Sequence, residues 1–341
     1  MPGRSIILLA LLGAAPAASP VYRVAASISG PDGAGWDYAA VDATARRLYV
    51  AHGEAVTVVA LDAASATTTS IGSIVHAHAV VPIPHTRLLL VTSGRDSTVR
   101  IIDIAGGRER ARISVGADPD AAIVDPASGH VLVMNAEAGT VSEIDAGTDG
   151  AEASVVRTIA VKPALEFAAI GRGRTMFVNN EDANEIDTVD LATGTAGAPI
   201  ALTGCTAPTG LAYDPATNTL ISACANGKAA IVAASARRLT ALVPIGAGPD
   251  AVILDAARRL AFIPCGRDGV LEVLSLDAPG GVRRVATVKT EIGARTGALD
   301  PATGAIYLPT ARFGPLVPGA KRPPALPGTF HILVVRPGRS S

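Results

Sequence analysis

Seven positions in the sequence, spaced 41 to 46 residues apart, hold mostly ionisable side chains that could do chemistry together. They are Asp37, His78, Asp120, Glu166, Thr209, Asp250 and Arg295. Carboxylates bind hard divalent cations and histidines bind softer ones, and either group can act as a general acid or base. His78, Glu166 and Asp120 are the predicted metal ligands, and a divalent metal ion is the one cofactor that these residues suggest.

The same side chains also allow an interpretation without chemistry. Like charges around a narrow opening raise carboxylate pKa values, as they often do in active sites. Polar residues at strand ends, however, also cap backbone groups and hold water. The segment "HAH" at residues 76–78 is the most suggestive, because His76 and His78 alternate along a strand and so face the same way. Hydration, binding and catalysis all remain open.

The elements that must position these residues are repeats. Each of the seven positions begins an apolar run, which is followed by a turn and a second apolar run, usually with two more runs after that. Val, Ile and Thr fill the runs, and turns such as "DPATG" separate them. Four short strands in a period of about 43 residues are typical of one propeller blade. The first runs read "DYAAVD", "HAVVPI", "DAAIVD", "EFAAIG", "TGLAYD", "DAVILD" and "RTGALD".

Closure of the ring gives a check on this prediction. The last repeat lacks a fourth strand, whereas "VYRVAASIS" at residues 21–29 stands alone before the first repeat. Pairing this strand with the last blade removes two open sheet edges. We therefore predict an all-β, seven-bladed β-propeller with four antiparallel strands per blade, forming a single domain over residues 19–341.

One segment interrupts the repeats. The last blade contains "RFGPLVPGAKRPPALPGTF", and its proline-rich part at residues 314–328 is longer than any equivalent connection. It is either a lid over one face or a solvated insertion.

The first residues have the pattern of a secretory signal. Arg4 precedes a short apolar run, and Ala15-Pro16-Ala17 resembles a cleavage site, which predicts a signal peptide over residues 1–18. The run is too short to span a bilayer, and no later segment is long and apolar enough. We expect a periplasmic or secreted bacterial protein, without a transmembrane span and monomeric.

The repeat text resembles the YncE-like family, also called YVTN-type β-propeller repeat proteins and described as cytochrome-d1-domain-like or surface-layer-related. The resemblance covers the mature chain. It rests on "VGADPDAAIVDPASGHVLV", "VTSGRDSTVRIIDI", "APTGLAYDPATNTLISAC" and "GARTGALDPATGAIYLPTARFG". It implies a seven-bladed propeller in an exported bacterial protein, and little about activity. The "YVTN" tetrad itself reads here as "YVAH", "LVTS", "FVNN" or "LISA".

In a propeller, the innermost strands line the central channel, and the loops before them share a face with the loops after the second strands. Further polar residues, among them Glu181 and Arg267, should lie near the seven positions on this face. The predicted ligand-binding face consists of Trp36, Asp37, His52, His76, His78, Asp120, Asn135, Glu166, Asn179, Thr209, Asp250, Arg295 and Phe313.

Two functions remain in competition. The first is a binding or scaffold protein that uses this face for a small ligand, a metal ion or a periplasmic protein partner. The second is a metal-assisted hydrolase or lactonase, in which His78 and Glu166 hold the ion while Asp120 or Asp250 acts as the base. An ion pair between Arg295 and Asp250 would favour the first.

The three cysteines divide into a pair and a single residue. Cys205 and Cys224 belong to one blade, before its first strand and at the end of its second, so we predict a disulfide between them. We expect Cys265 to be buried and not to act as a nucleophile.

Absent features narrow the function further. Without C-x-x-C-H there is no covalent c-type haem. The balance of 29 basic against 30 acidic residues and the aromatic content of 3% argue against nucleic acid as a main partner.

Overall fold

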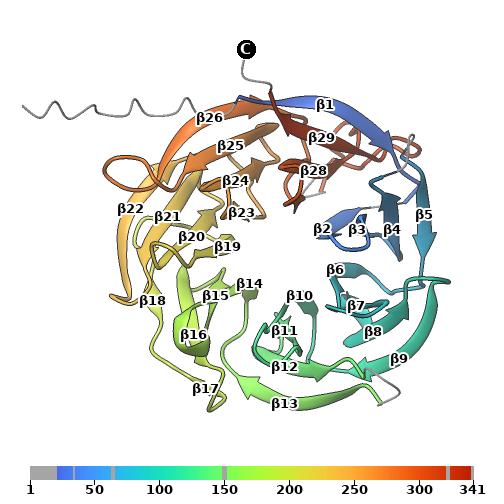
Figure 1. The fold of residues 1–341 in the computed structure, drawn as a ribbon, viewed down its shortest axis with the longest axis horizontal. Helices are drawn as coiled ribbons and strands as arrows, with labels where there is room; N and C mark the ends of the chain where they lie inside the picture. The colour runs from blue at the N-terminus through green and yellow to red at the C-terminus, as the bar shows by residue number, and fades with distance from the viewer. Residues whose placement is uncertain (1–20, 34, 63–65, 148–151, 320–322, 339–341) are drawn as a thin grey trace, which may run out of the picture.

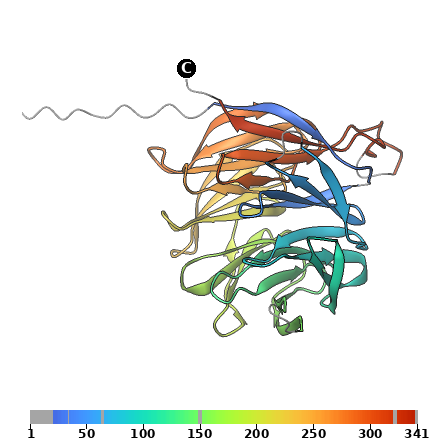
Figure 2. The ribbon, with the colours of Figure 1, turned by 45° about the vertical axis from the view of Figure 1, so that its right-hand side comes forward.

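The computed structural model describes residues 21–33, 35–62, 66–147, 152–319 and 323–338. Its strands form seven antiparallel sheets arranged as blades around a central axis (Figures 1 and 2). Apart from two 3₁₀ turns, η1 (Gly94–Asp96) and η2 (Arg172–Arg174), every regular element described is a strand. The predicted seven-bladed, all-β propeller is therefore confirmed. The predicted signal peptide, residues 1–18, lies outside the described residues, as do residues 320–322 of the insertion.

The first four blades follow one another along the chain, with the innermost strand first. Blade 1 contains β2 (Trp36–Asp42), β3 (Arg47–His52), β4 (Ala55–Ala60) and β5 (Thr68–Ile71). Blade 2 contains β6 (Ala77–Pro82), β7 (Leu88–Ser93), β8 (Thr98–Asp103) and β9 (Arg108–Ser114). Blade 3 contains β10 (Pro119–Val124), β11 (Val131–Asn135), β12 (Thr140–Asp145) and β13 (Ser154–Ala160). Blade 4 contains β14 (Leu165–Ile170), β15 (Thr175–Asn180), β16 (Glu185–Asp190) and a split outer strand, β17 (Thr195–Ala196) with β18 (Ile200–Ala201).

The remaining blades close the ring. Blade 5 contains β19 (Pro208–Asp214), β20 (Thr219–Cys224), β21 (Lys228–Ala233) and β22 (Arg238–Pro244). Blade 6 contains β23 (Ile253–Asp255), β24 (Leu260–Cys265), β25 (Val270–Ser275) and β26 (Arg283–Lys289). Blade 7 contains β27 (Ala298–Asp300), β28 (Ala305–Thr310), β29 (His331–Pro337) and, as its outer strand, β1 (Tyr22–Ser29). β1 pairs with β29 as predicted, so the two ends of the ring are joined by a strand ladder (Figure 1).

The burial of each strand follows its place in the blade. The second strands are almost continuously buried, because each is covered by a blade on either side; β7 and β28 are examples. The outer strands are largely exposed, and β13 alternates between exposed residues and residues that are at least partly buried, because one of its faces meets water. The hydrophobic core therefore lies between blades, in layers that run around the ring.

A backbone irregularity is repeated at one end of the inner strands. The residue two places before each of the seven aligned positions has a positive φ; examples are His76 (68°) and Asp118 (53°). In blades 1 to 5 the inner strand then bulges, so that three steps along it match two on its partner, as between Trp36 and Ala39 in blade 1. A bulge re-aims side chains. We call this end of the blades the pocket end.

A second repeated feature marks the opposite end, which we call the turn end. The tight turn after each inner strand also contains a residue with positive φ, and in three blades that residue is an arginine. Each arginine crosses to a buried aspartate in the preceding blade of the ring. The pairs are Arg46 with Asp300 (2.8 Å), Arg174 with Asp125, and Arg259 with Asp214 (2.7 Å).

The described parts of the proline-rich insertion pack against the base of the insertion itself. Phe313 pairs with Ala325 in an isolated β-bridge, and Gly314 N donates to Pro324 O at 2.9 Å. Leu316 and Val317 point outward and are more than half exposed. Among the described residues, no helix has the length and apolar character needed to cross a membrane.

Candidate functional site

All seven aligned positions line one cavity of about 490 Å³ on the axis at the pocket end. The ring predicted from the repeat spacing therefore lines one cavity, and in blades 1 to 5 its residues lie within the bulges of the inner strands. The cavity is lined by Gly35, Trp36, Asp37, Tyr38, Gly53, His76, Ala77, His78, Asp120, Glu166, Glu181, Thr209, Ala225, Gly248, Pro249, Asp250, Arg267 and Arg295. We call it the central pocket.

Two aromatic side chains meet across the axis beside this ring. Tyr38 comes from blade 1 and Phe167 from blade 4, and their ring centroids are 5.2 Å apart. These blades are not neighbours, so the contact fills the channel between them. Burial, with the charges of Asp120 and Glu166, raises the pKa of the Tyr38 hydroxyl well above its usual range. Tyr38 therefore contributes a neutral hydroxyl to the wall of the pocket.

Four residues of the predicted face do not line the pocket. His52 stacks on Phe330 and bonds through Nδ1 to Thr57 Oγ1 at 3.0 Å. Asn135 is fully buried and donates to Ser142 Oγ at 3.0 Å. Asn179 Nδ2 donates to the carbonyl oxygen of Thr209, and Phe313 packs near Trp36. His52 and Asn135 are both buried, so their side chains lie in the interior and not in the pocket.

One wall of the pocket contains a carboxylate–histidine cluster. His78 Nδ1 donates to Asp37 Oδ2 at 2.8 Å and lies 3.3 Å from Asp120 Oδ1. Asp120 Oδ1 is shielded from solvent and accepts no hydrogen bond within the described part of the chain, because the Nδ1 proton is directed at Asp37. Burial, with the charge of Asp37, raises the pKa of Asp120 to about 8, although His78 acts in the opposite direction.

The protonation of His78 follows from the same contacts. Burial alone would lower its pKa, but the hydrogen bond to Asp37 and the charge of Asp120 outweigh burial, so the pKa is raised. Its other nitrogen, Nε2, lies 2.8 Å from His76 Nδ1. Burial and the neighbouring His78 lower the pKa of His76. His78 is therefore the protonated partner, and it donates to a carboxylate on one side and to a neutral imidazole on the other.

Backbone geometry holds His78 in place. His76 adopts a left-handed conformation that is uncommon for residues other than glycine. Gly94 packs directly on the imidazole of His78, since a Cβ there would lie 2.7 Å from its Nε2. A larger residue at position 94 would displace the ring.

The adjoining part of the wall, on blade 4, contains two carboxylates that have no partner among the described residues. Within the described part of the chain, the side chains of Glu166 and Glu181, both from blade 4, make no hydrogen bond or ion pair, although both line the pocket. Burial raises the pKa of Glu166 well above its usual range, and the charges of Asp120 and Asp250 add to this effect. Arg267, on blade 6, lines the pocket in the same unpaired state.

Arg295 is fully engaged by contrast. Its Nε donates to Asp250 Oδ2 at 2.6 Å, and its Nη2 donates to the carbonyl oxygen of Trp36 at 2.9 Å. The second bond joins blade 7 to blade 1. Thr296 Oγ1 adds another across the same seam, to the carbonyl oxygen of Asp37 at 2.8 Å. Arg295 thus both neutralises an acid of the ring and helps to close the propeller.

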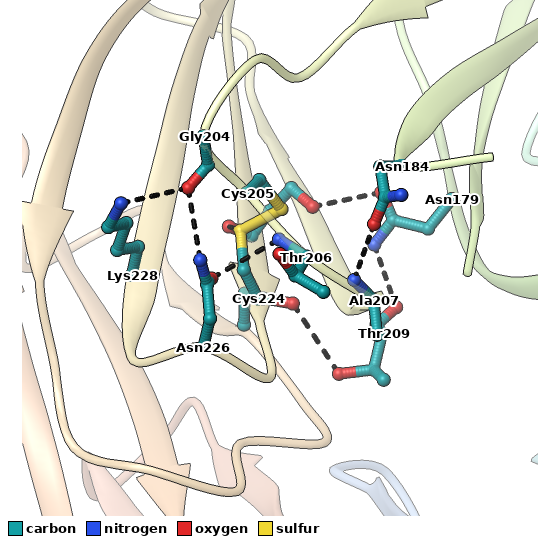
Figure 3. Close-up of a disulfide and its surroundings, with 12 residues drawn as sticks. Asn179, Asn184, Gly204, Cys205, Thr206, Ala207, Thr209, Cys224, Asn226 and Lys228 are labelled. Atoms are coloured by element: carbon teal, nitrogen blue, oxygen red, sulfur yellow. Dashed lines mark hydrogen bonds between the residues drawn. A yellow bond between two sulfur atoms is a disulfide. The ribbon is translucent and has the colours of Figure 1, made fainter. Parts of the chain in front are cut away.

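A disulfide supports the wall formed by blade 5 (Figure 3). It links Cys205, just before the inner strand, to Cys224, the last residue of β20. Thr209 lines the pocket beyond the first cysteine, and its carbonyl oxygen accepts from Asn179 Nδ2 at 2.8 Å. Ala225 lines the pocket directly after the second cysteine. The disulfide therefore joins the two segments that make this part of the wall.

The third cysteine and Phe313 have packing roles. Cys265 is free and completely buried at the end of β24, and burial raises the pKa of its thiol to about 12. It is not a thiolate at neutral pH. Phe313 lies 6.0 Å from Trp36 between ring centroids, so the insertion contacts a residue of the pocket without lining it.

Metal-binding geometry occurs in a different set of residues from the predicted one. Asp37, His78 and Asp120 offer one ligand atom each within 4.8 Å of one another, and they form the one such group found among the described residues. Glu166, predicted as a ligand together with His78 and Asp120, lies outside this group.

The residue that sequence reasoning missed is Tyr38. The sequence does contain a pattern that indicates its role. At the position after each ring residue, the chain has an aromatic residue in two blades, Tyr38 in blade 1 and Phe167 in blade 4. The other five blades have small residues there: Ala79, Ala121, Gly210, Ala251 and Thr296. Two large side chains and five small ones at this position indicate that the large pair fills the central channel.

Comparison with known proteins supports the fold. No protein-family model matches the chain, and no curated protein matches it significantly. Among solved structures, hydrazine synthase from Kuenenia stuttgartiensis is similar with a TM-score of 0.69 and 17% identity, covering 82% of this chain and 93% of that one. A chain from a mitotic checkpoint complex is similar with a TM-score of 0.71 and 13% identity, covering 97% of this chain and 98% of that one. At such identities the likeness concerns the fold alone, and the protein is by this evidence a seven-bladed β-propeller.

Proposed function

We propose that the protein is a non-catalytic binding propeller, which holds a small polar ligand with at least one positive charge in its central pocket. One observation carries this proposal: Glu166 and Glu181 face the pocket without a partner among the described residues, whereas the arginine of the ring, Arg295, is already paired with Asp250. A buried acid without a partner is unfavourable, and a cationic ligand would relieve that cost.

The charges of the pocket also define the ligand's shape. The unpaired acids belong to blade 4, and the unpaired Arg267 belongs to blade 6, with blade 5 between them. A ligand with an amino group at one end could therefore place a carboxylate at the other. A volume of about 490 Å³ accommodates a molecule of metabolite size and excludes a folded partner.

The experiment is a binding titration with three ligands of matched size: an amine, an amino acid and a carboxylic acid. We expect the amine and the amino acid to bind and the carboxylic acid not to bind. Glu166→Gln should weaken amine binding at least tenfold. Glu137→Gln removes an exposed acid outside the pocket and should change nothing. Preferential binding of the carboxylic acid would contradict the proposal.

A second function, metal-assisted hydrolysis of a lactone or ester, has one observation in its favour, the grouping of Asp37, His78 and Asp120. The pairing of Asp250 with Arg295 at 2.6 Å counts against it, because this acid was one of the two candidate bases. The other, Asp120, belongs to the ligand group itself. Turnover of any lactone in a test panel, in the presence of added metal, would favour the hydrolase over the binding protein.

We also propose that the protein is exported and belongs with the YncE-like propellers. The disulfide between Cys205 and Cys224 supports export, because disulfides persist mainly in oxidising compartments. Amino-terminal sequencing of protein recovered from the periplasm and the culture medium tests this, and an uncleaved cytoplasmic product would contradict it.

A further inference from the structure

We infer that Asp37, His78 and Asp120 form a site for one divalent transition-metal ion on the wall of the central pocket. This inference rests on the proposed binding role of the pocket, because the ion would enter through the same opening. It differs from the set expected from sequence in replacing Glu166 by Asp37.

The positions of the ligand atoms fit an ion. His78 Nδ1 lies 2.8 Å from Asp37 Oδ2 and 3.3 Å from Asp120 Oδ1. A tetrahedral ion with bonds of about 2.0–2.1 Å sets its ligand atoms about 3.3 Å apart. The cluster therefore needs only a small expansion between His78 and Asp37 to bind one. The ion would take the place of the proton that these two residues share.

An unsatisfied acceptor independently points to a missing ligand. Asp120 Oδ1 has almost no solvent contact and accepts no hydrogen bond from any residue that the structure describes, although it lies beside His78. A buried acceptor left in this state costs about 1–3 kcal/mol. A proton on Nδ1 can serve only one of the two carboxylates, whereas a metal ion in the same place serves both. The ion thus accounts for an oxygen that the protein leaves without a partner.

The surroundings of His78 are those of a metal ligand. A coordinating histidine usually donates its second ring N–H to an outer partner, which fixes the tautomer and the orientation of the ring. His76 Nδ1 provides that partner at 2.8 Å from Nε2, and it is held there in a left-handed backbone conformation. Gly94 permits the close packing that fixes the other side of the ring. Nδ1 is thereby left as the coordinating nitrogen.

The donors define the class of metal. One imidazole nitrogen with two carboxylate oxygens suits Zn²⁺, Mn²⁺ or Fe²⁺ better than Ca²⁺, which prefers six to eight oxygen ligands. Three protein ligands leave at least one coordination position open toward the pocket. Water or a second small ligand could occupy that position.

The experiment is a titration of the chelator-treated, untagged protein with Co²⁺ alone, followed by calorimetry and by the visible absorption of the bound ion. We expect one ion per chain and a spectrum typical of nitrogen and oxygen ligands. His78→Ala and the isosteric Asp37→Asn should each weaken binding at least 100-fold. His76→Ala should weaken it about tenfold, as loss of an outer partner does.

Two matched control variants show whether the loss of binding is specific to the cluster. His130→Ala removes a histidine paired with Glu143 away from the pocket, and it should leave binding unchanged. Glu137→Gln removes an exposed acid outside the pocket, and it should also leave Co²⁺ binding unchanged. Urea unfolding curves of each variant show whether it is folded.

The outcomes are distinct from those of the proposed function. Absence of Co²⁺ binding, or binding that survives both His78→Ala and Asp37→Asn, overturns the metal site. If amines still bind in that case, with the expected loss in Glu166→Gln, the proposed binding role stands without the metal. If Co²⁺ binds as expected and no amine does, the site stands and the pocket's ligand is the ion.

Discussion

Buried acidic residues occur at both ends of the inner strands, but their pKa values are shifted in opposite directions at the two ends. At the turn end, Asp214 is buried, and the hydrogen bonds from Arg259 hold its pKa down at about 2. At the pocket end, burial and neighbouring charges raise the pKa of Asp120 to about 8 and displace that of Glu166 in the same direction.

This difference separates stability from function within one repeat. At both ends, a residue with positive φ lies next to the inner strand, so the local backbone conformation is similar at the two ends. The turn end uses it to place an arginine against the acid of the neighbouring blade. The pocket end leaves acids facing each other across a cavity, an arrangement that favours unfolding unless a ligand binds. The turn end therefore contributes to stability, and the pocket end is where we propose that a ligand binds.

The largest effect should come from breaking an ion pair at the turn end. Arg259→Ala leaves Asp214 buried and uncompensated, so we expect the free energy of unfolding to fall by about 3–5 kcal/mol in urea at pH 7. Arg87→Ala is the control, because that side chain is 73% exposed and lies 3.9 Å from Asp103. It should cost less than about 1 kcal/mol. Equal losses in the two variants would contradict the role assigned to the turn end.

The second prediction concerns the disulfide that links two segments of the pocket end. Replacing both Cys205 and Cys224 by Ser opens a loop with a sequence separation of 19. We expect a loss of about 3 kcal/mol in the free energy of unfolding. A dithiol reductant should lower the wild-type protein to the same value and leave the double variant unchanged. A variant as stable as the wild type would show that blade 5 does not need the disulfide.

The acid dependence of stability provides the third test. The pKa of Asp214 is about 2 in the folded protein against 3.8 for an ordinary aspartate. Since the folded pKa is the lower one, the stabilisation is complete above about pH 4 and is lost as the pH falls toward 2. The pKa difference corresponds to about 2 kcal/mol. Unfolding free energies measured from pH 7 to pH 2 should therefore differ between wild type and Asp214→Asn above pH 4, and converge below it.

The turn-end and pocket-end residues were not equally predictable from sequence. The repeat spacing was sufficient to predict seven blades, the closure by β1 and the ring of seven positions, because each depends on one pattern repeated along the chain. The pairing of Arg259 with Asp214 was not predicted, since it joins different blades through a side chain. Which ring acids are paired also depends on contacts between blades.

The side chains behind the pocket illustrate another limit. His52 and Asn135 are the last residues of second strands, and both were expected on the open face. Successive residues in a strand face opposite sides, so a difference of one position decides whether a side chain points to the pocket or between blades. The bulges near the ring change that count locally. Sequence alone does not reveal where each bulge lies.

The sharpest test of the comparison is a gain of stability from removing an acid. Burial and the charges of Asp120 and Asp250 raise the pKa of Glu166 well above 4.5, so the folded protein keeps this proton at pH values where the unfolded chain has lost it. Wild-type stability must then fall as the pH rises above 4.5, opposite in sign to the effect of Asp214. Glu166→Gln cannot ionise. With chelator present and no ligand, the melting temperature of Glu166→Gln should match that of the wild type at pH 4 and exceed it at pH 8. Glu137→Gln is the control, because Glu137 is exposed and lies outside the pocket, and its melting temperature should not diverge from the wild type in this way. A variant that loses stability at pH 8 would mean that Glu166 is held by a favourable contact, and the pocket end would then be no different in kind from the turn end.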